Sequence, residues 1–134
     1  MDLQIAEQVA LVTGASRGIG AATARLLAAE GVDVIVGFHR NASGAEETGA
    51  AIVQRGRRSW ICRMDVTDPS AVREAIGGLP EKARRLDMLI HCAGEAPVGS
   101  LSELTCDEWR RVVDVNLNGA FHVLHGAQSL IVEG

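Results

Sequence analysis

Apolar residues occur along the chain in short runs that alternate with longer, helix-like stretches. The four short runs cover 9–12, 32–38, 59–64 and 86–91, and they have the length and composition of buried strands. A helical pattern follows each of them, over 21–29, 43–55, 68–76 and 105–130. Regular alternation of strand and helix predicts an α/β domain with a parallel sheet and right-handed crossovers.

Local signals support these helix boundaries. Ser43/Glu46 and Thr105/Glu108 have the spacing of capping boxes, and Asp68/Pro69 combines an N-cap residue with proline at the first helical position. We expect a charged connection over 80–85 and a Gly/Pro-rich loop over 94–100.

No repeat, low-complexity segment or linker divides the chain, so residues 1–134 are expected to form a single domain. The pattern predicts a doubly wound parallel sheet of about four βα units, with strand order 3-2-1-4. In such a sheet the ligand crevice lies at the carboxyl ends of the first and fourth strands.

Glycines follow the first predicted strand directly, at Gly14, Gly18 and Gly20. A strand, a glycine turn and a helix start form a phosphate cradle, because the backbone comes close to the anion and the helix N-terminus faces it. Such turns also join strands to helices for packing alone, and that alternative stays open. No Lys-Ser/Thr pair follows the last glycine, so the turn is not a P-loop.

The segment Thr13–Gly20 resembles the TGxxxGxG cofactor motif of the short-chain dehydrogenase/reductases. Three further stretches match that family in order and spacing: Asp65-Val66, 91–94 (HCAG) and 114–119 (DVNLNG). The likeness covers nearly the whole chain and is greatest to the 3-oxoacyl-carrier-protein reductase type. It implies a Rossmann-type fold and an NAD(P)-dependent oxidoreductase that transfers a hydride to or from a carbonyl or alcohol carbon.

The resemblance also implies roles for individual residues. Phosphates would lie at the glycine turn, and Asp65 with Val66 would hold the adenine, although Asp65 could instead cap the following helix. The family usually has Asn-Asn-Ala-Gly where this chain has His91 and Cys92 in place of both asparagines. We interpret His91 as a structural histidine rather than a catalytic base. The implied cofactor-binding residues are Gly14, Ser16, Arg17, Gly18, Ile19, Gly20, His39, Arg40, Asp65, Val66, Cys92, Ala93 and Gly94.

The residues around the second predicted strand favour NADP(H) over NAD(H). An NAD site usually has an acidic residue about 20 positions past the glycines, and the matching position here is Phe38. Basic side chains at His39, Arg40 and Arg17 suit a 2′-phosphate, although His39 and Arg40 could also be ordinary solvated residues.

The family's proton-transfer groups are missing from this sequence. The family uses a Tyr, a Lys four residues later and a Ser, but the chain has no Tyr and its single Lys is Lys82. Asn116 matches the fourth catalytic residue of the family, or it bonds a neighbouring carbonyl for structural reasons. We therefore expect the cofactor-binding portion of an oxidoreductase, truncated and inactive alone. The alternative is a non-catalytic nucleotide-binding or assembly module that acts through a partner chain.

Apolar residues recur at helical spacing along 105–130, at Trp109, Val113, Leu117, Ala120 and Leu124. We expect this stripe to be mostly core and, as in the family, partly a subunit interface. The strand 86–91 would be an exposed edge, which predicts self-association or a completing partner chain. His122 and His125 lack a third ligand nearby, so no metal site is predicted.

Charge and cysteine content limit the class of partner. A formal net charge of −4 and a pI near 5.5 argue against nucleic acid or an anionic membrane surface. No apolar run approaches the ~20 residues of a membrane span, and the N-terminus lacks a signal pattern. Three cysteines without CxxC spacing predict free thiols in a reducing cytoplasm.

Overall fold

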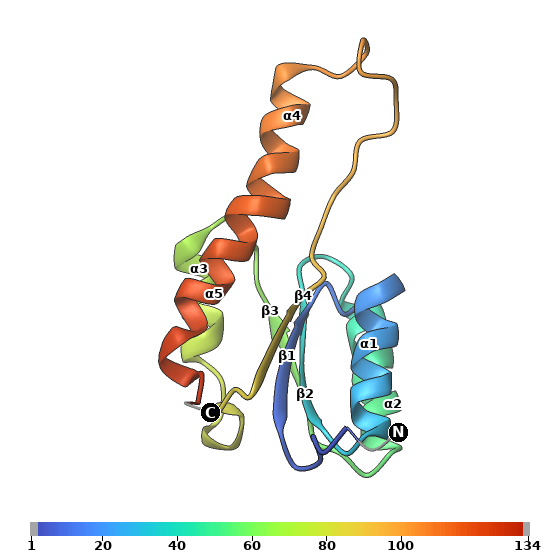
Figure 1. The fold of residues 1–134 in the computed structure, drawn as a ribbon, viewed down its shortest axis with the longest axis vertical. Coiled ribbons are helices and arrows are strands. Elements are labelled where there is room, and N and C mark those ends of the chain that lie inside the picture. The colour runs from blue at the N-terminus through green and yellow to red at the C-terminus, as the bar shows by residue number, and fades with distance from the viewer. Residues whose placement is uncertain (1–2, 133–134) are drawn as a thin grey trace.

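A computed structural model describes residues 3–132 as a parallel sheet between two layers of helices (Figure 1). The strands are β1 (Val9–Thr13), β2 (Asp33–Phe38), β3 (Ser59–Arg63) and β4 (Met88–His91). The helices are α1 (Gly18–Ala29), α2 (Ala42–Val53), α3 (Pro69–Gly77), α4 (Cys106–Val113) and α5 (Gly119–Ala127). Shorter segments are the 3-10 turns η1 (Glu81–Ala83) and η3 (Gln128–Leu130) and the π-helical η2 (Asp114–Asn118). The outermost residues of the expected domain, 1–2 and 133–134, lie outside the described part.

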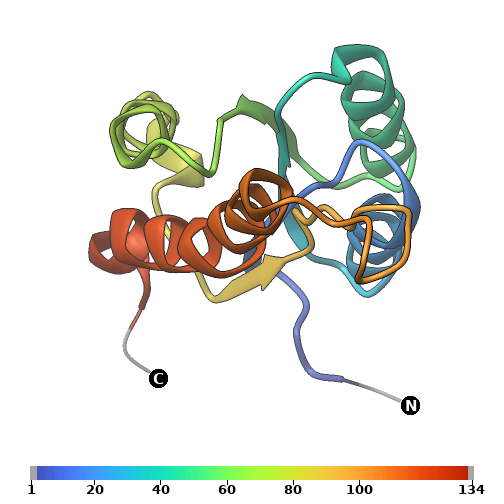
Figure 2. The same ribbon diagram turned by 90° about the horizontal axis from the view of Figure 1, so that it is seen from above.

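The sheet has the predicted strand order, β3-β2-β1-β4, and all pairs are parallel. Leu11 of β1 is paired with Ile35 of β2 on one side and with Leu89 of β4 on the other. Helices α1 and α2 cover one face, and α3 and α5 cover the other, as the view from above shows (Figure 2). Because both faces are covered, every residue of β1 and β2 is buried, which explains why apolar residues predominate in both strands.

The fourth strand is shorter than the sequence indicates, because at Asp87 a side chain replaces part of the backbone pairing with β1 and Leu86 bonds to another segment. The Asp87 carboxylate accepts a hydrogen bond from the backbone N–H of Val9 (2.9 Å). Leu86 instead pairs with the C-terminal segment: its N–H donates to the Leu130 carbonyl, and its own carbonyl accepts from the Val132 N–H. Ile131 thus forms a parallel bridge with Leu86, on the side of β4 away from β1.

Two of the three predicted helix caps are confirmed. Asp68 accepts from the N–H groups of the first turn of α3, and Thr105 with Glu108 forms a complete capping box on α4. The capping box expected at Ser43/Glu46 was wrong, because α2 is capped by Asn41, whose Oδ1 accepts from Gly44 N (3.1 Å). Ser43 therefore lies inside the first turn.

The expectation that the Trp109–Leu124 stripe is mostly core was also wrong. Trp109, Leu117 and Leu124 are 58%, 68% and 52% exposed. The face that packs inward carries smaller residues, with Gly119, Val123 and Ala127 buried. Small residues let α5 approach α3 and the 64–66 segment closely: a Cβ on Gly119 would lie 2.7 Å from a Val66 methyl group. The large apolar residues are left on the outer face.

A buried carboxylate, Asp33, links β2 to the residues just before β3, near the amino ends of the strands. Asp33, at the start of β2, accepts from the Arg58 N–H (2.8 Å) and Nε (2.6 Å), and Arg57 lies 2.9 Å away. Burial alone would raise the pKa of Asp33, but these hydrogen bonds and charges outweigh burial and lower it.

Within residues 3–132 no helix is long and apolar enough to cross a bilayer.

Candidate functional site

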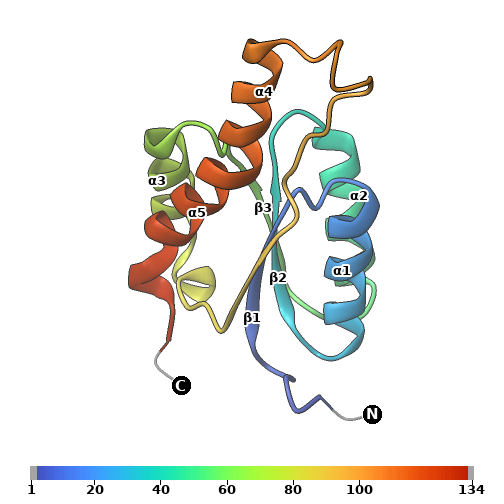
Figure 3. The ribbon, with the colours of Figure 1, turned by 45° about the horizontal axis from the view of Figure 1, so that its top comes forward.

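An open cleft of about 1050 Å³ lies at the carboxyl ends of the strands. Helix α4 and the long segment that leads into it extend beyond these strand ends (Figure 3). The lining comes from the ends of β1, β2, β3 and β4, from the start of α1 and from α4. All thirteen residues predicted to bind a cofactor line this cleft: Gly14, Ser16, Arg17, Gly18, Ile19, Gly20, His39, Arg40, Asp65, Val66, Cys92, Ala93 and Gly94.

Glycine is required where the turn after β1 meets the end of β4. Gly14 has φ +63°, and a Cβ there would lie 2.7 Å from both the Cys92 carbonyl oxygen and the Ala93 nitrogen. A Cβ on Gly20 would overlap the Gly14 carbonyl. The turn is therefore packed between the end of β4 and the first turn of α1, with no room for a side chain at Gly14 or Gly20.

The N-terminus of α1 opens into the same cleft. Its N-cap residue, Arg17, makes no side-chain cap, so the N–H groups of the first turn are left for another acceptor. The turn itself is held in place, because Ala15 N–H donates to the Gly37 carbonyl (2.8 Å) and Asn41 Nδ2 donates to the Ser16 carbonyl (3.3 Å). Free donors and the positive end of the helix dipole form an anion site here.

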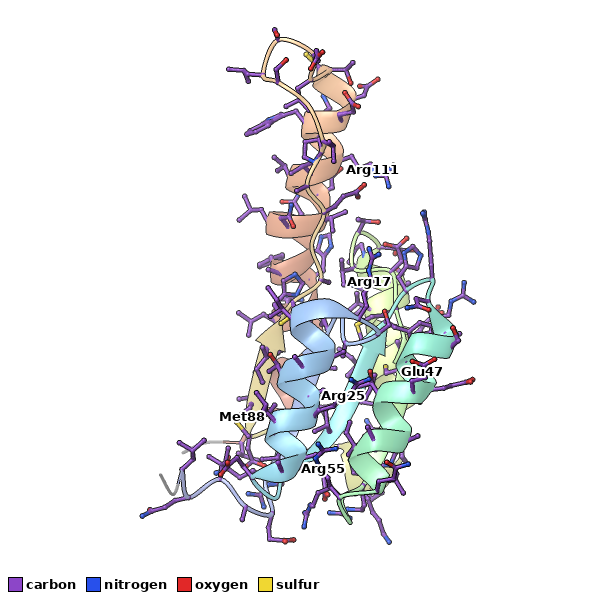
Figure 4. All side chains as sticks on the ribbon, turned by 90° about the vertical axis from the view of Figure 1, so that its right-hand side faces the viewer. Arg17, Arg25, Glu47, Arg55, Met88 and Arg111 are labelled. Carbon is purple, nitrogen blue, oxygen red and sulfur yellow. The ribbon has the colours of Figure 1, made fainter. Side chains whose placement is uncertain are left out.

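Basic side chains follow β2 at the edge of the cleft. Phe38, at the position where an acidic residue would accept from a ribose, is 8% exposed and turned into the core. His39 and Arg40 are exposed and line the cleft together with Arg17, which lies at the start of α1 (Figure 4). His39 Nε2 lies 3.5 Å from Asp65 Oδ2.

The two oxygens of Asp65 have different partners, with Oδ2 facing His39 and Oδ1 facing Thr67. Its Oδ1 accepts from the Thr67 hydroxyl (2.7 Å) and N–H (3.0 Å), and the bond to the hydroxyl is the main cause that lowers the pKa of Asp65. Helix α3 is capped by Asp68, so Asp65 does not cap it. The neighbouring Val66 carbonyl accepts from His122 Nδ1 (2.8 Å), which fixes the loop against α5.

Beneath the glycine turn, Thr13 and His91 join the ends of β1 and β4. The Thr13 hydroxyl oxygen accepts from the N–H groups of Cys92 and Ala93 (3.1 Å each) and lies 3.0 Å from His91 Nδ1. Burial lowers the pKa of His91, and its Nε2 is buried without a hydrogen-bond partner among the described residues.

Glu95 lines the cleft and is fixed in place by contacts with Asn116 and Arg111. Asn116 binds both backbone groups of Glu95, accepting from its N–H (3.0 Å) and donating to its carbonyl (2.6 Å). Arg111 pairs with the Glu95 carboxylate through two nitrogens. Asn116 lies on the π-helical segment and does not line the cleft itself. Its predicted catalytic role stays a prediction.

Several cleft residues were not among the predicted ones. Thr13 was visible only as the first residue of the glycine motif, and its hydrogen bonds cross 78 or more positions of sequence. Glu95 and the α4 side chains Asp107, Arg110 and Arg111 also line the cleft. Figure 4 shows Arg111 on the same side of the molecule as Arg17. The two histidines considered as metal ligands act separately, since His122 bonds Val66 and His125 stacks on Phe121.

The cleft fits a dinucleotide, because it combines an uncapped helix start, a glycine turn whose backbone is open at Gly18 and flanking basic groups. A parallel doubly wound sheet with this turn at its switch point defines a Rossmann-type nucleotide-binding protein. The family model for short chain dehydrogenases matches residues 8–134, and the chain belongs to the short-chain dehydrogenase/reductase family.

Individual relatives agree with this assignment. The chain is 44% identical over 115 residues to a cis-4-hydroxycyclohexanecarboxylate dehydrogenase of Sinomonas cyclohexanicum, covering 85% of this chain and 45% of the relative. It is 35% identical over 126 residues to a 3-oxoacyl-[acyl-carrier-protein] reductase of Synechocystis sp., covering 94% and 51%. The chain therefore spans about half the length of these relatives.

Solved structures show the same arrangement. A short chain dehydrogenase from Burkholderia cenocepacia in complex with NADP superposes with a TM-score of 0.88 at 38% identity, covering 96% of this chain and 53% of that one. A carveol dehydrogenase from Mycobacterium avium in complex with NAD gives 0.86 at 28% identity, covering 94% and 50%. The relatives thus include binders of both nicotinamide cofactors.

Proposed function

We propose that this chain is the cofactor-binding portion of an oxidoreductase that moves a hydride between NADP(H) and a carbonyl or alcohol carbon. The observation that carries the proposal is the pressed glycine turn at the uncapped start of α1, open to a cleft lined by all thirteen candidate residues. The bound nicotinamide would supply or accept the hydride. The protein's own residues would bind the dinucleotide and fix its orientation.

Each part of the cleft has a role in this binding. The N–H groups of the first turn of α1 would donate to the pyrophosphate, which approaches closely because Gly18 and Gly20 carry no side chain. Asp65, with Oδ2 not taken by Thr67, would accept from the adenine amine beside Val66. Cys92, Ala93 and Gly94 would lie along the ribose on the nicotinamide side.

The preference for NADP(H) follows from the residues after β2. Phe38 is buried and offers no acceptor for a ribose 2′-hydroxyl. Arg40, Arg17 and His39 line the same end of the cleft, where a 2′-phosphate would gain charge-assisted hydrogen bonds from guanidinium groups. A carboxylate at this place would repel that phosphate.

We further propose that residues 1–134 do not complete the reaction alone. The sequence contains no Tyr, and Lys82 lies within η1 and is not among the residues that line the cleft. Asn116 would be the one catalytic residue of the family's tetrad present here. A second candidate function is a non-catalytic nucleotide-binding or assembly module, and the exposed Trp109, Leu117 and Leu124 favour it, because they offer a partner chain or a second copy an apolar surface.

A titration with NADPH and NADH tests the proposal, with energy transfer from Trp60 and Trp109 to the bound nicotinamide as the signal. We expect saturable binding that is tighter for NADPH. Arg40→Ala should weaken NADPH about 10- to 100-fold, the equivalent of one charge-assisted contact, and leave NADH nearly unchanged. Arg55→Ala is the matched control, because Arg55 is an exposed arginine at the other end of α2 (Figure 4).

Three results would count against the proposal. Equal affinity for both cofactors would refute the NADP(H) preference, and an equal effect of the two arginine variants would refute the role of Arg40. Oxidation of NADPH by the 134-residue chain with a carbonyl substrate would contradict its predicted inactivity.

A further inference from the structure

The hydrogen-bond geometry at Thr13 determines which nitrogen of His91 carries the proton. The Thr13 hydroxyl has two lone pairs and one hydrogen, and the N–H groups of Cys92 and Ala93 already occupy its acceptor side. The remaining contact, to His91 Nδ1 at 3.0 Å, must therefore be made by the hydroxyl hydrogen. Nδ1 is the acceptor, so the neutral ring carries its proton on Nε2.

The surroundings of His91 offer a positive charge no counter-ion. His91 lies on the face of β4 that carries Leu89 and Ala93, which pack with Val115 in the core layer under η2 and α5. The titratable groups on the elements of this layer have other partners or are exposed: Cys62 on β3, Asp65 after β3, Arg73 and Glu74 on α3, Asp114 on η2, His122 and His125 on α5. Cys92, directly after β4, packs on the opposite face of the sheet. Within residues 3–132 no carboxylate is paired with His91.

A proton on Nδ1 would break this arrangement. Two donors, Nδ1–H and the Thr13 hydroxyl, would then face each other at 3.0 Å unless the hydroxyl turned away. If the hydroxyl oxygen accepted from His91 instead, it would release Cys92 N–H or Ala93 N–H, because it cannot accept three bonds. Those two amides belong to the Cys92–Ala93 backbone, which lies directly against Gly14. We call this backbone segment the floor of the cleft.

We propose that Thr13 and neutral His91 form a proton-sensitive latch that positions the Cys92–Ala93 segment under the glycine turn, so that protonation of His91 releases the floor of the cleft. His91 is a positioning residue here, because it acts through Thr13 and does not line the cleft. The effect on cofactor binding rests on the proposed function. The latch itself does not, and can be measured without a cofactor.

Nitrogen-15 NMR of the histidine rings and the backbone amides tests the latch directly, with no cofactor present. At pH 7.5 we expect His91 to be the Nε2–H tautomer, and on acidification the amide shifts of Cys92 and Ala93 should move together with the His91 ring. The Nδ1–H tautomer, or amides that do not follow His91, would overturn the proposal. This measurement needs only the unmodified chain, so it holds even if every variant fails to fold.

Cofactor binding as a function of pH gives the second readout. His91→Gln keeps a side-chain acceptor for Thr13 but does not titrate, and His125→Gln is the control, since His125 is exposed and lies outside the cleft. If only the latched form binds, the wild-type Kd should rise up to tenfold per pH unit below the titration of His91, relative to His91→Gln. The ratio cancels the titration of the cofactor's own phosphate.

Each outcome of the binding experiment decides one of the two claims. Parallel pH profiles for wild type and His91→Gln would overturn the latch while leaving the proposed function intact. Absence of dinucleotide binding at every pH would refute the proposed function for this chain, and the NMR titration would then decide the latch alone.

Discussion

Replacing Gly14 with alanine should destabilise the protein for two separate reasons. The residue has φ +63°, a conformation that costs an L-residue with a Cβ about 1–2 kcal/mol. The new methyl group would also lie 2.7 Å from the Cys92 carbonyl oxygen and the Ala93 nitrogen. These are backbone atoms that Thr13 holds in place, so relief requires the ends of β1 and β4 to separate. Overpacking of this kind costs about 1–3 kcal/mol.

Gly56 provides a matched control for the first reason alone. It has φ +75°, is exposed after α2, and would have nothing within 4 Å of an added Cβ. Gly56→Ala should therefore cost only about 1 kcal/mol, because the conformational penalty is partly offset by a less flexible unfolded chain. Gly14→Ala should exceed it by the overpacking cost, about 1–3 kcal/mol.

Urea unfolding of the wild type and both variants measures this difference, and the larger loss should appear as a lower midpoint without a change in slope. Dinucleotide binding, measured on folded Gly14→Ala, should weaken as well, because the floor of the cleft moves. Equal free energies of unfolding for the two variants would refute the argument that the close approach of β1 and β4 requires glycine at this position.

Three further predictions concern other parts of the molecule. Because burial lowers the pKa of His91 from 6.5, its contribution to stability is complete above that pH and is lost as the pH falls below it; wild type should lose up to about 1.4 kcal/mol per pH unit relative to His91→Gln in denaturant titrations. Asp33→Asn should lower the free energy of unfolding by about 2–3 kcal/mol in the same assay, because the neutral amide is a weaker acceptor than the buried carboxylate for the hydrogen bonds from Arg58. A loss below about 0.5 kcal/mol would contradict this. Leu117→Asp on the outer face of the α4–α5 region should shift sedimentation toward the monomer, whereas Leu26→Asp on α1, equally exposed at 68%, should not.

Local sequence was enough to predict most of the fold because the informative residues are close together. The run 9–12 followed by Gly14, Gly18 and Gly20 predicted β1, the turn and α1, and the alternation of elements predicted the strand order. Asp68 and Thr105 marked helix starts correctly, since capping involves residues within one turn. The cleft lining followed from motifs that each end a strand.

The predictions that were wrong concern features decided by contacts between residues far apart in the sequence. Asn41 rather than Ser43 caps α2, where Asn41 also reaches the Ser16 carbonyl 25 residues away. The helical spacing of Trp109 to Leu124 predicted an apolar face correctly, but periodicity does not say which of two faces packs inward. The small residues of α5 decide that, because they match the groove beside Val66 and Val72.

Residues 96–99 form an exposed segment that is held in place at both ends, so insertions should be tolerated there. On the N-terminal side, Glu95 is held by Asn116 and Arg111. On the C-terminal side, Ser100 donates its N–H to the Glu103 carboxylate, just before the start of α4. Extra residues between these anchors would not shift the cleft floor or α4, and doubling the length of such a loop costs only about 0.6 kcal/mol of closure entropy. Added binding elements could therefore be grafted here, directly beside the cleft, while the fold beneath keeps its geometry.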